Sequence, residues 1–593
     1  MSINTASFKF GTWQITLRVI RMEIYPAYFV LIGLIVYLCA YFVYAKRYDK
    51  KVWQPDPKAT TPAHMYMDGV EFFPSSKFIL YGFQFKGIAG AAPIVGPFVA
   101  LQFGWLPALL WILIGNFFIG WIHDYGSIFM GVRKEGKTLG PLTYELISPR
   151  ARSCLMAFLI FYLLTIIAAF FNVCGTLYNA RGGGLIFTIF IVIAGILAGA
   201  LLYKAKLHVS VVTIVGIIIM LIGLYVGSVV LPLAANEVSY ELAVVITALI
   251  CLISAVVPII WFAQPVNYMA FYPCIGGIIV IVIGALASPI TNVTVVPPAL
   301  TSNWMYPSLA VGPIWPILFV SIACGAISGW HSLVSTSGTA RQLDLETDAL
   351  PIGAGSMLTE GLLALSALAA YMSFSTPAMA AAGSYGGFAS GASRLVAPIL
   401  FTTETNPALK TFFMAFIAIY AVTILQLAIR FWRLALTEIT APLPALRLSI
   451  GNKWVGSIIG LVIGGLLAWT GSFINLWTLF GGANQLMAGL ALILVSIYLA
   501  NMKKPTKYTL APAIFMVITC EAALVYEAYL FFNAIITNAP IASGRIKGYP
   551  EIALGLNAVF AIIGIVLVIL GIIVAYDAAK ALSKARKAKK ESQ

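Results

Sequence analysis

The sequence predicts an all-α polytopic membrane protein that crosses the bilayer about 15 times. Of its 593 residues, 61% are hydrophobic and only 10% are charged, whereas soluble domains carry about 25% charged residues. Apolar runs close to the roughly 20 residues that span a bilayer recur along the chain. Lysine and arginine gather in alternate connections between these runs. Because the runs are long and continuous, a β-barrel, whose strands would be short and alternating, is excluded.

The expected transmembrane segments follow one another with mostly short connections. They lie approximately at 24–45, 87–104, 106–131, 153–177, 184–203, 209–232, 240–263, 268–290, 312–335, 352–375, 408–430, 453–472, 477–501, 509–533 and 554–578. For the stretch 1–23 we expect a short amphipathic helix on the membrane surface, with a re-entrant segment as the alternative. Seven cysteines occur without a CxxC pair, so neither a disulfide framework nor a zinc site is expected.

The distribution of basic residues predicts the orientation of the chain. If the N-terminus lies outside and the segments alternate, 28 of the 36 Lys and Arg residues fall on the inner side and 8 on the outer side. Because cationic connections stay in the cytoplasm, we expect a multi-pass protein of the cytoplasmic (inner) membrane with its N-terminus outside and its C-terminus inside. The lipid bilayer thus accounts for the net charge of +15, and no nucleic acid partner is expected.

The stretch 87–97 is apolar but rich in helix-breaking residues. It reads GIAGAAPIVGP. A break within the bilayer survives only where protein buries it or where it lines an aqueous cavity, and transporters use such breaks to bind ions and substrate. A kinked helix whose glycines allow close packing is the alternative. The residues expected at this site are Gly90, Ala91 and Pro93 for substrate, and the carbonyls of Ala89 and Ala92 for a cation.

A second interrupted segment follows five segments later. The run 240–263 leads into VVPIIWFAQP, with prolines at 258 and 265. Two interrupted segments at this odd spacing run in opposite directions, and they indicate a core of two inverted repeats of five helices each, the leucine-transporter arrangement. We expect substrate contacts from Pro258, Trp261 and Gln264. Two ordinary prolines in a membrane helix are the alternative.

The same arrangement places hydroxyl ligands for a sodium ion on the eighth core helix, here the segment 312–335. Hydroxyls recur near its end at steps of three and four, which places them on one side of a helix. This polar stripe consists of Ser328, Ser332, Ser335, Thr336 and Thr339. We expect Ser332, Ser335 and Thr336 to bind the cation. The alternative is that each hydroxyl bonds a carbonyl of its own helix.

Few ionisable residues lie inside the apolar segments. A charge deep in lipid costs a few kcal/mol, so such a residue usually faces a cavity or a partner. His331, in the polar stripe, and Glu360 are expected to relay protons or to contact substrate. The pair His123–Asp124 is read either in the same way or as a cytoplasmic helix cap.

These elements divide the chain into five parts. They are a surface segment 1–23, a peripheral helix and cytoplasmic connector 24–86, a ten-helix transport core 87–430, peripheral C-terminal helices 431–579 and a basic cytoplasmic tail 580–593. The sequence contains no HExxH, no GxSxG and no close carboxylate pair on one helical face, so no enzyme is expected.

Several long blocks resemble the carbon starvation protein A family of membrane transporters. They include 87–97 with its continuation 102–107, HDY at 123–125, GKTLG at 136–140, CGAISGWHSLVST at 324–336, MLTE at 357–360 and LWTLFGGANQLMAG at 476–489. The resemblance extends from about residue 46 to 500. It implies membership of the amino acid–polyamine–cation superfamily and uptake of pyruvate or peptides with a cation during carbon starvation.

Two positions depart from the pattern of that family. Where members usually carry a His pair before a phenylalanine, this chain has Phe83 and Gln84, which counts against proton coupling if that pair handles protons. Where members commonly read Ser-Ser-Gly-Thr, this chain reads STSG from Ser335 to Gly338, which keeps two adjacent hydroxyls for a cation.

We therefore expect a secondary active symporter that imports pyruvate or small peptides. The expected coupling ion is Na⁺ or H⁺, and no cofactor is expected. The amides and dipole of a half-helix N-terminus would hold the substrate carboxylate. The alternatives are a transporter-like nutrient sensor and a channel, but the sequence shows neither a signalling domain nor the repeated filter or charged rings of a channel.

Overall fold

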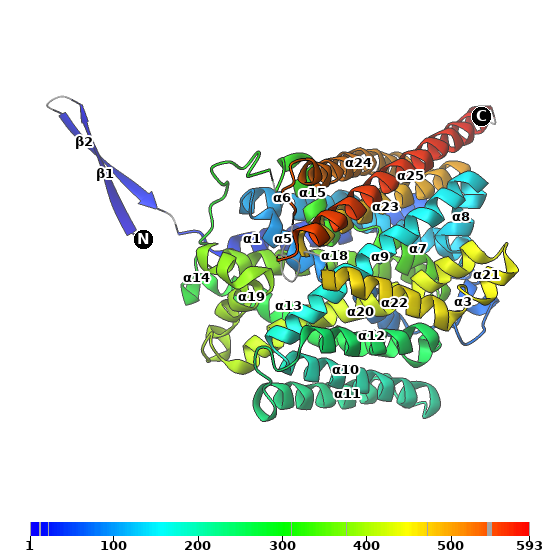
Figure 1. Ribbon diagram of the computed structural model, residues 1–593, viewed down its shortest axis with the longest axis horizontal. Coiled ribbons are helices and arrows are strands. Elements are labelled where there is room, and N and C mark those ends of the chain that lie inside the picture. Colours follow the sequence, from blue (N-terminus) through cyan, green and yellow to red (C-terminus); the bar gives the residue numbers. More distant parts are fainter. Residues whose placement is uncertain are drawn as a thin grey trace.

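The structure is a computed structural model that describes residues 2–10, 13–21, 23–309, 311–374, 376–470, 473–541 and 548–591. Long helices that run side by side dominate it (Figure 1). In chain order the first helices are α1 (Pro26–Cys39), α2 (Lys46–Tyr48), α3 (Pro62–Met65), α4 (Lys77–Ile88), α5 (Ala92–Ala100), α6 (Trp105–Gly115), α7 (Trp121–Arg133), α8 (Leu139–Leu146), α9 (Pro149–Ala180), α10 (Gly183–Gly199), α11 (Val209–Tyr225), α12 (Tyr240–Val256) and α13 (Ala263–Leu286). They are followed by α14 (Ser288–Thr291), α15 (Ile314–Ser321), α16 (Ala323–Ala326), α17 (Trp330–Ser337), α18 (Ala349–Met372), α19 (Thr376–Val396), α20 (Pro407–Thr440), α21 (Pro444–Leu448), α22 (Lys453–Thr470), α23 (Phe473–Asn501), α24 (Lys507–Ile536) and α25 (Pro550–Glu591).

The bundle confirms a multi-pass membrane protein. Among the described residues, eleven helices are long and apolar enough to cross a membrane, and the bent pair α4–α5 makes a twelfth. The helices α12 and α22 are shorter and also apolar. The expected count of about 15 spans is therefore reached only if these short helices and the discontinuous segment α15–α17 cross as well.

The N-terminal stretch forms a β-hairpin, so the expected surface helix is wrong. Strand β1 (Ser2–Phe10) pairs antiparallel with β2 (Trp13–Arg21), with Ser2 opposite Arg21 and Phe10 opposite Trp13. Figure 1 shows this hairpin standing apart from the helices. Apolar and polar residues alternate over most of both strands, a period of two that favours a strand over a helix.

The two ends of the bundle differ in the connections that they carry. The short helices α3, α8 and α21 and the C-terminus lie at one end, on the right in Figure 1, and α14, α19 and the N-terminal hairpin lie at the other. Most of the 28 basic residues expected on the inner side belong to connections at the α3–α8–α21 end. The bundle therefore has one basic end, which accords with alternating spans.

The first broken helix begins earlier in the chain than expected. Helix α4 starts at Lys77, where the Ser76 hydroxyl accepts from the amide of Ile79 as an N-cap, and α5 follows after a bend of 40°. We call Ala89–Ala91 the α4–α5 break. Because Gln84 and Lys86 interrupt the apolar run, hydropathy placed this part of the helix in the connector 24–86.

The second broken segment is not the expected one. Pro258 lies in the connection between α12 and α13, which contains the short 3₁₀ turn Ile259–Trp261, and Pro265 lies in the first turn of α13. The stretch 314–337, in contrast, is interrupted between α15 and α16 and again at Ile327–Gly329, the α16–α17 break. It packs against α5 and α4. The helix-breaking residues Pro316, Gly325 and Gly329 were the signals in the sequence for this interruption.

Helix α23 lies inside the bundle, although the sequence placed it among peripheral helices. Every residue from 479 to 500 in its membrane-spanning part is buried. It packs against α9, α7 and α17 as well as against α24 and α25. The C-terminal helices therefore contribute to the centre of the molecule, and the boundary drawn at residue 430 does not separate core from periphery.

Candidate functional site

Side chains of α23 satisfy the backbone groups that the α16–α17 break leaves free. The side-chain Oδ1 atom of Asn484 accepts from the backbone amide of Trp330 at 3.0 Å. The backbone carbonyl of Asn484 accepts from the backbone amide of Gly329 at 2.9 Å. The Gln485 amide donates to the carbonyl of Ile327, in this break, at 3.4 Å and to that of Ile322, between α15 and α16, at 3.1 Å. Within a membrane an unpaired backbone group costs several kcal/mol. Two adjacent amide side chains thus stabilise this break.

The α4–α5 break lies beside α17, as the sequence predicts. The indole of Trp330 donates to the carbonyl of Gly87 at 2.6 Å. A Cβ atom on Gly87 would lie 3.0 Å from Val334, and one on Gly90 would lie 3.1 Å from both Phe170 and Ile424. The small residues of this stretch therefore allow α9, α17 and α20 to close on the break. Both interruptions meet in the interior of the bundle.

The hydroxyls of the polar stripe are largely engaged elsewhere. Thr336 donates to the carbonyl of Ser332 at 2.7 Å, and Ser332 donates to that of Gly329 at 2.7 Å. Ser335 accepts from the Gln84 amide at 3.2 Å. Two of the three expected cation ligands thus bond carbonyls of their own segment, which was the alternative reading. A sodium site with the carbonyls of Ala89 and Ala92 stays a prediction.

A histidine between two carboxylates occupies the middle of the bundle. The Nδ1 atom of His331, on α17, lies 2.9 Å from Oδ2 of Asp124 on α7. Its Nε2 atom lies 3.1 Å from Oε2 of Glu360 on α18. On the far side of Asp124, His123 Nδ1 lies 2.8 Å from Oδ1. All four side chains are fully buried. Of the two readings of His123–Asp124, the cytoplasmic cap is therefore wrong, because Asp124 pairs with His331 in the interior.

A lysine lies close to these residues. Lys86, in the last turn of α4, is fully buried. Its ammonium lies 3.4 Å from the centroid of the Tyr420 ring and within electrostatic range of Glu360. We call Lys86, Asp124, His331 and Glu360 the charged centre. Four groups that can each carry a charge thus occupy the interior of a membrane bundle, where charges mark ion and substrate pathways.

One set of side chains in the described part of the chain could hold a metal ion. The ligand atoms of Cys324, His331 and Glu360 all lie within 4.8 Å of one another. A thiol, an imidazole and a carboxylate are all zinc ligands. Because His331 Nε2 already faces a Glu360 oxygen, the same atoms can equally share a proton.

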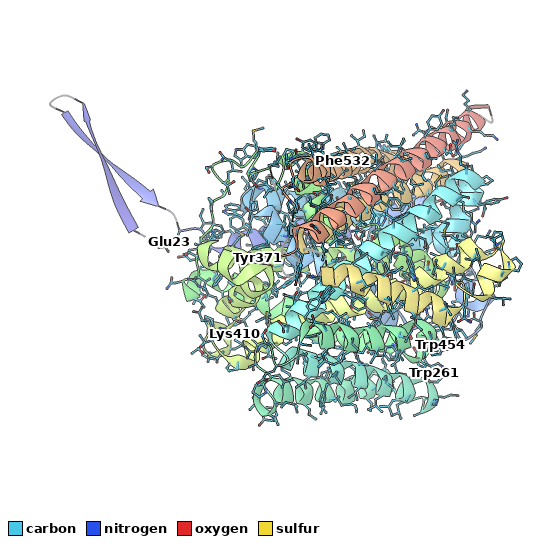
Figure 2. The ribbon with its side chains drawn as sticks, in the orientation of Figure 1. Glu23, Trp261, Tyr371, Lys410, Trp454 and Phe532 are labelled. Carbon is cyan, nitrogen blue, oxygen red and sulfur yellow. The ribbon has the colours of Figure 1, made fainter. Side chains whose placement is uncertain are left out.

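The structure brings together only some of the expected site residues. Gly90, Ala91 and Pro93 lie at the first break, and a Cβ atom on Gly325 would lie 3.7 Å from Pro93. Trp261 lies at the end of the bundle, near the labelled Trp454 in Figure 2. Pro258 lies in the same connection as Trp261.

The remaining expected substrate residue, Gln264, forms hydrogen bonds with neighbouring side chains of the protein. Its amide donates to Ser75 Oγ at 3.0 Å and to Gln342 Oε1 at 2.8 Å, and Tyr203 donates to its Oε1 atom. This cluster ties the start of α13 to neighbouring connections. The structure thus does not join the 258–264 group to His331 and Glu360.

Sequence reasoning missed Lys86 and the two amides on α23. Lys86 was assigned to a cytoplasmic connector, and the run 477–501 was treated as peripheral. An Asn-Gln pair inside an apolar run is itself a signal, because buried amides need partners. Asn484 and Gln485 could have been singled out on that ground.

Comparisons with known proteins agree on one family. A family model described as carbon starvation protein CstA matches residues 25–380 and 369–523. The peptide transporter CstA of Bacillus subtilis is 27% identical over 595 residues, which cover 93% of this chain and 96% of the relative. The pyruvate/proton symporter BtsT of Escherichia coli is 28% identical over 581 residues, covering 82% and 80%. The solved structure of the Eremococcus coleocola manganese transporter covers 83% of this chain at 15% identity, with a TM-score of 0.34 that is too low to establish a shared fold.

Proposed function

This chain belongs to the carbon starvation protein CstA family and is a membrane transporter, and we propose that it imports a small carboxylate such as pyruvate by symport with protons during carbon starvation. The names of its relatives support both peptide transport and pyruvate–proton symport. Small peptides are the second candidate substrate. Both substrates carry a carboxylate, which a buried cation such as Lys86 would attract.

The observation that carries proton coupling is the contact of one imidazole with two carboxylates. His331 faces Asp124 through one ring nitrogen and Glu360 through the other, at 2.9 and 3.1 Å. Imidazole is the side chain best suited to accept and release a proton near neutral pH. Buried chains of acids and histidines in transporters serve as proton relays.

A charge balance gives the expected stoichiometry. With Asp124 and Glu360 ionised and His331 and Lys86 protonated, the empty charged centre is neutral. A bound substrate carboxylate adds one negative charge, and a proton on Glu360 offsets it. Because an unpaired buried charge costs several kcal/mol, the loaded centre would take up one proton for each carboxylate. Transport would then be electroneutral.

The hydroxyl stripe keeps sodium as a second candidate for the coupling ion. Ser332 and Thr336 donate to carbonyls of their own segment, which leaves the lone pairs of their oxygens available to a cation. Sodium bound by Ser335 and the carbonyls of Ala89 and Ala92 is the second candidate. It predicts uptake that a sodium gradient drives.

Movement of the two broken segments would give access to the charged centre. Alternating access in transporters is largely a rocking of one repeat against the other around a fixed site. We infer that α4–α5 and α15–α17 separate from α9 and α20 toward each side in turn. Two inverted repeats of five helices each, beginning with α4–α5, would provide the rocking halves.

The charge asymmetry of the bundle suggests its orientation. The basic end that carries α3, α8 and α21 would face the cytoplasm of the inner membrane. The C-terminus would then be cytoplasmic and the N-terminal hairpin external. Import thus proceeds from the α14–α19 end to the basic end.

Uptake into proteoliposomes tests this function. Labelled pyruvate and labelled dialanine are offered separately under an inward proton gradient, an inward sodium gradient or neither. We expect pyruvate to accumulate under the proton gradient. Accumulation driven by sodium alone would replace the proton with sodium, and the absence of accumulation of either substrate under any gradient would reject a symporter and favour a sensor or channel.

A further inference from the structure

Lys86 can carry a charge, and no described carboxylate forms a close ion pair with it. Its side chain is fully buried, and its Nζ atom has no hydrogen-bond partner among the described residues. No described carboxylate lies within 4.0 Å of it. A buried ammonium without a paired anion costs several kcal/mol. A buried lysine without a permanent anionic partner is suited to bind a transported anion reversibly.

The groups around the ammonium hold it in place without neutralising it. The face of Tyr420 lies 3.4 Å away as measured to the ring centroid, and a cation over a desolvated ring gains about 2 kcal/mol. The thiol of Cys274 lies close to the ammonium. Glu360 is within electrostatic range but forms its ion pair with His331. The ring and the thiol are neutral, so the positive charge remains available.

The position of Lys86 is suited to a transported ligand. It lies in the last turn of α4, immediately before the α4–α5 break. Phe170 and Ile424 approach Gly90 so closely that a Cβ atom there would lie 3.1 Å from each. Separation of α4–α5 from α9 and α20 would therefore uncover the break and the ammonium together.

We propose that Lys86 is the receptor for the substrate carboxylate and selects a small monocarboxylate over a zwitterion. The proposal rests on the proposed import of carboxylates, and it adds the binding residue and the charge class. A monocarboxylate offers one charge to one ammonium. The amino group of a zwitterionic dipeptide would bring a third cation into a space that already holds Lys86 and His331. Pyruvate should therefore bind more tightly than dialanine.

Equilibrium binding to the purified full-length protein tests this role without a gradient. Labelled pyruvate is titrated into wild type, Lys86→Met, Lys86→Arg and Lys46→Met, with unlabelled dialanine as a competitor. Lys46→Met is the matched control, because its ammonium also lies over an aromatic ring, at 4.6 Å from the Phe42 centroid, but at the surface. We expect Lys86→Met to weaken pyruvate binding at least tenfold, Lys86→Arg to retain part of it and Lys46→Met to match wild type.

Thermal unfolding separates a binding role from a structural one. A proton on Glu360 can offset the positive charge that Lys86→Met removes, so the empty variant should melt close to the temperature of wild type. Pyruvate should raise the melting temperature of wild type and leave that of Lys86→Met unchanged. A Lys86→Met protein that melts well below wild type without pyruvate would show that the lysine is structural, and would overturn the proposal.

The outcomes also separate this inference from the proposed coupling. Equal pyruvate binding by wild type and Lys86→Met, tighter binding of dialanine than of pyruvate, or no pyruvate binding by wild type would each overturn the role of Lys86. If pyruvate binding depends on Lys86 but a proton gradient drives no uptake, proton coupling fails while the receptor assignment stands.

Discussion

Replacing Glu360 by glutamine should uncouple transport from the proton gradient while leaving transport itself intact. Glu360 is fully buried, and its ion-pair contact among the described residues is His331 Nε2, 3.1 Å from Oε2. Glutamine has nearly the same size, so packing is preserved. With pyruvate bound, Asp124 and the substrate then balance His331 and Lys86, and the loaded centre is neutral without an added proton.

The charge balance sets the size of the effect. For one proton per carboxylate, a gradient of one pH unit supplies about 1.4 kcal/mol, which is a tenfold accumulation at equilibrium. Wild type should therefore reach about tenfold in vesicles whose membrane potential is clamped at zero. Glu360→Gln should reach a ratio of about one in the same vesicles, and its pyruvate counterflow should continue and no longer depend on pH.

The assay compares accumulation and counterflow in the same proteoliposomes. Glu521→Gln is the matched control. Glu521 is another acid of a membrane helix, α24, and lies outside the charged centre, and its oxygens have no hydrogen-bond partner among the described residues. It should accumulate pyruvate as wild type does. Tenfold accumulation by Glu360→Gln, or equal loss in Glu521→Gln, would refute the reasoning that one titrating carboxylate couples the two solutes.

Two further predictions concern stability, measured as thermal unfolding of the purified protein. Gly183→Ala should destabilise the protein by about 1–3 kcal/mol or more, because its Cβ atom would lie 1.9 Å from the carbonyl oxygen of Gly227. The control Gly276→Ala, with no packing neighbour within 4 Å of the new Cβ among the described residues, should not destabilise it. Equal shifts in the two variants would contradict close packing of α10 on the end of α11. Arg430→Met should cost about 3–5 kcal/mol, because it leaves Glu71, 2.7 Å from the guanidinium, without its partner. The double variant with Glu71→Gln should recover part of that loss, and a fully additive loss would mean that the pair does not interact.

The sequence was sufficient for the membrane class and for the first broken helix. Length and hydropathy of the apolar runs determine where helices can cross a bilayer, because each buried backbone group must find its partner within the segment. The glycine–proline pattern of 87–97 marks a real break beside the polar stripe. Local composition fixes these features, so they could be read directly.

The second break and the charged centre depend on tertiary contacts. Prolines 258 and 265 have the same local signature as a broken helix, but they serve a connection between α12 and α13. The break at Ile327–Gly329 persists because Asn484, more than 150 residues later in the chain, bonds its amides. The sequence around this break contains no sign of a partner so far along the chain.

The individual acids and bases were visible, but their pairing was not. His331 and Glu360 stood out because charges are rare in apolar segments. Asp124 looked like a helix cap, and Lys86 looked like a connector residue, since hydropathy averages over a window and cannot show which face of a helix is turned inward. Only the packing of α4, α7, α17 and α18 brings the four charges together.

Proton movement during pyruvate entry tests proton symport most directly. Proteoliposomes that contain a pH-sensitive dye are clamped at zero membrane potential, with equal pH on both sides and no sodium, and labelled pyruvate is added outside. The charge balance predicts that the lumen acidifies with one proton for each pyruvate that enters, and that the ratio stays the same when the clamped potential is changed. Pyruvate entry with no change of internal pH, or entry only when sodium is present, would contradict it.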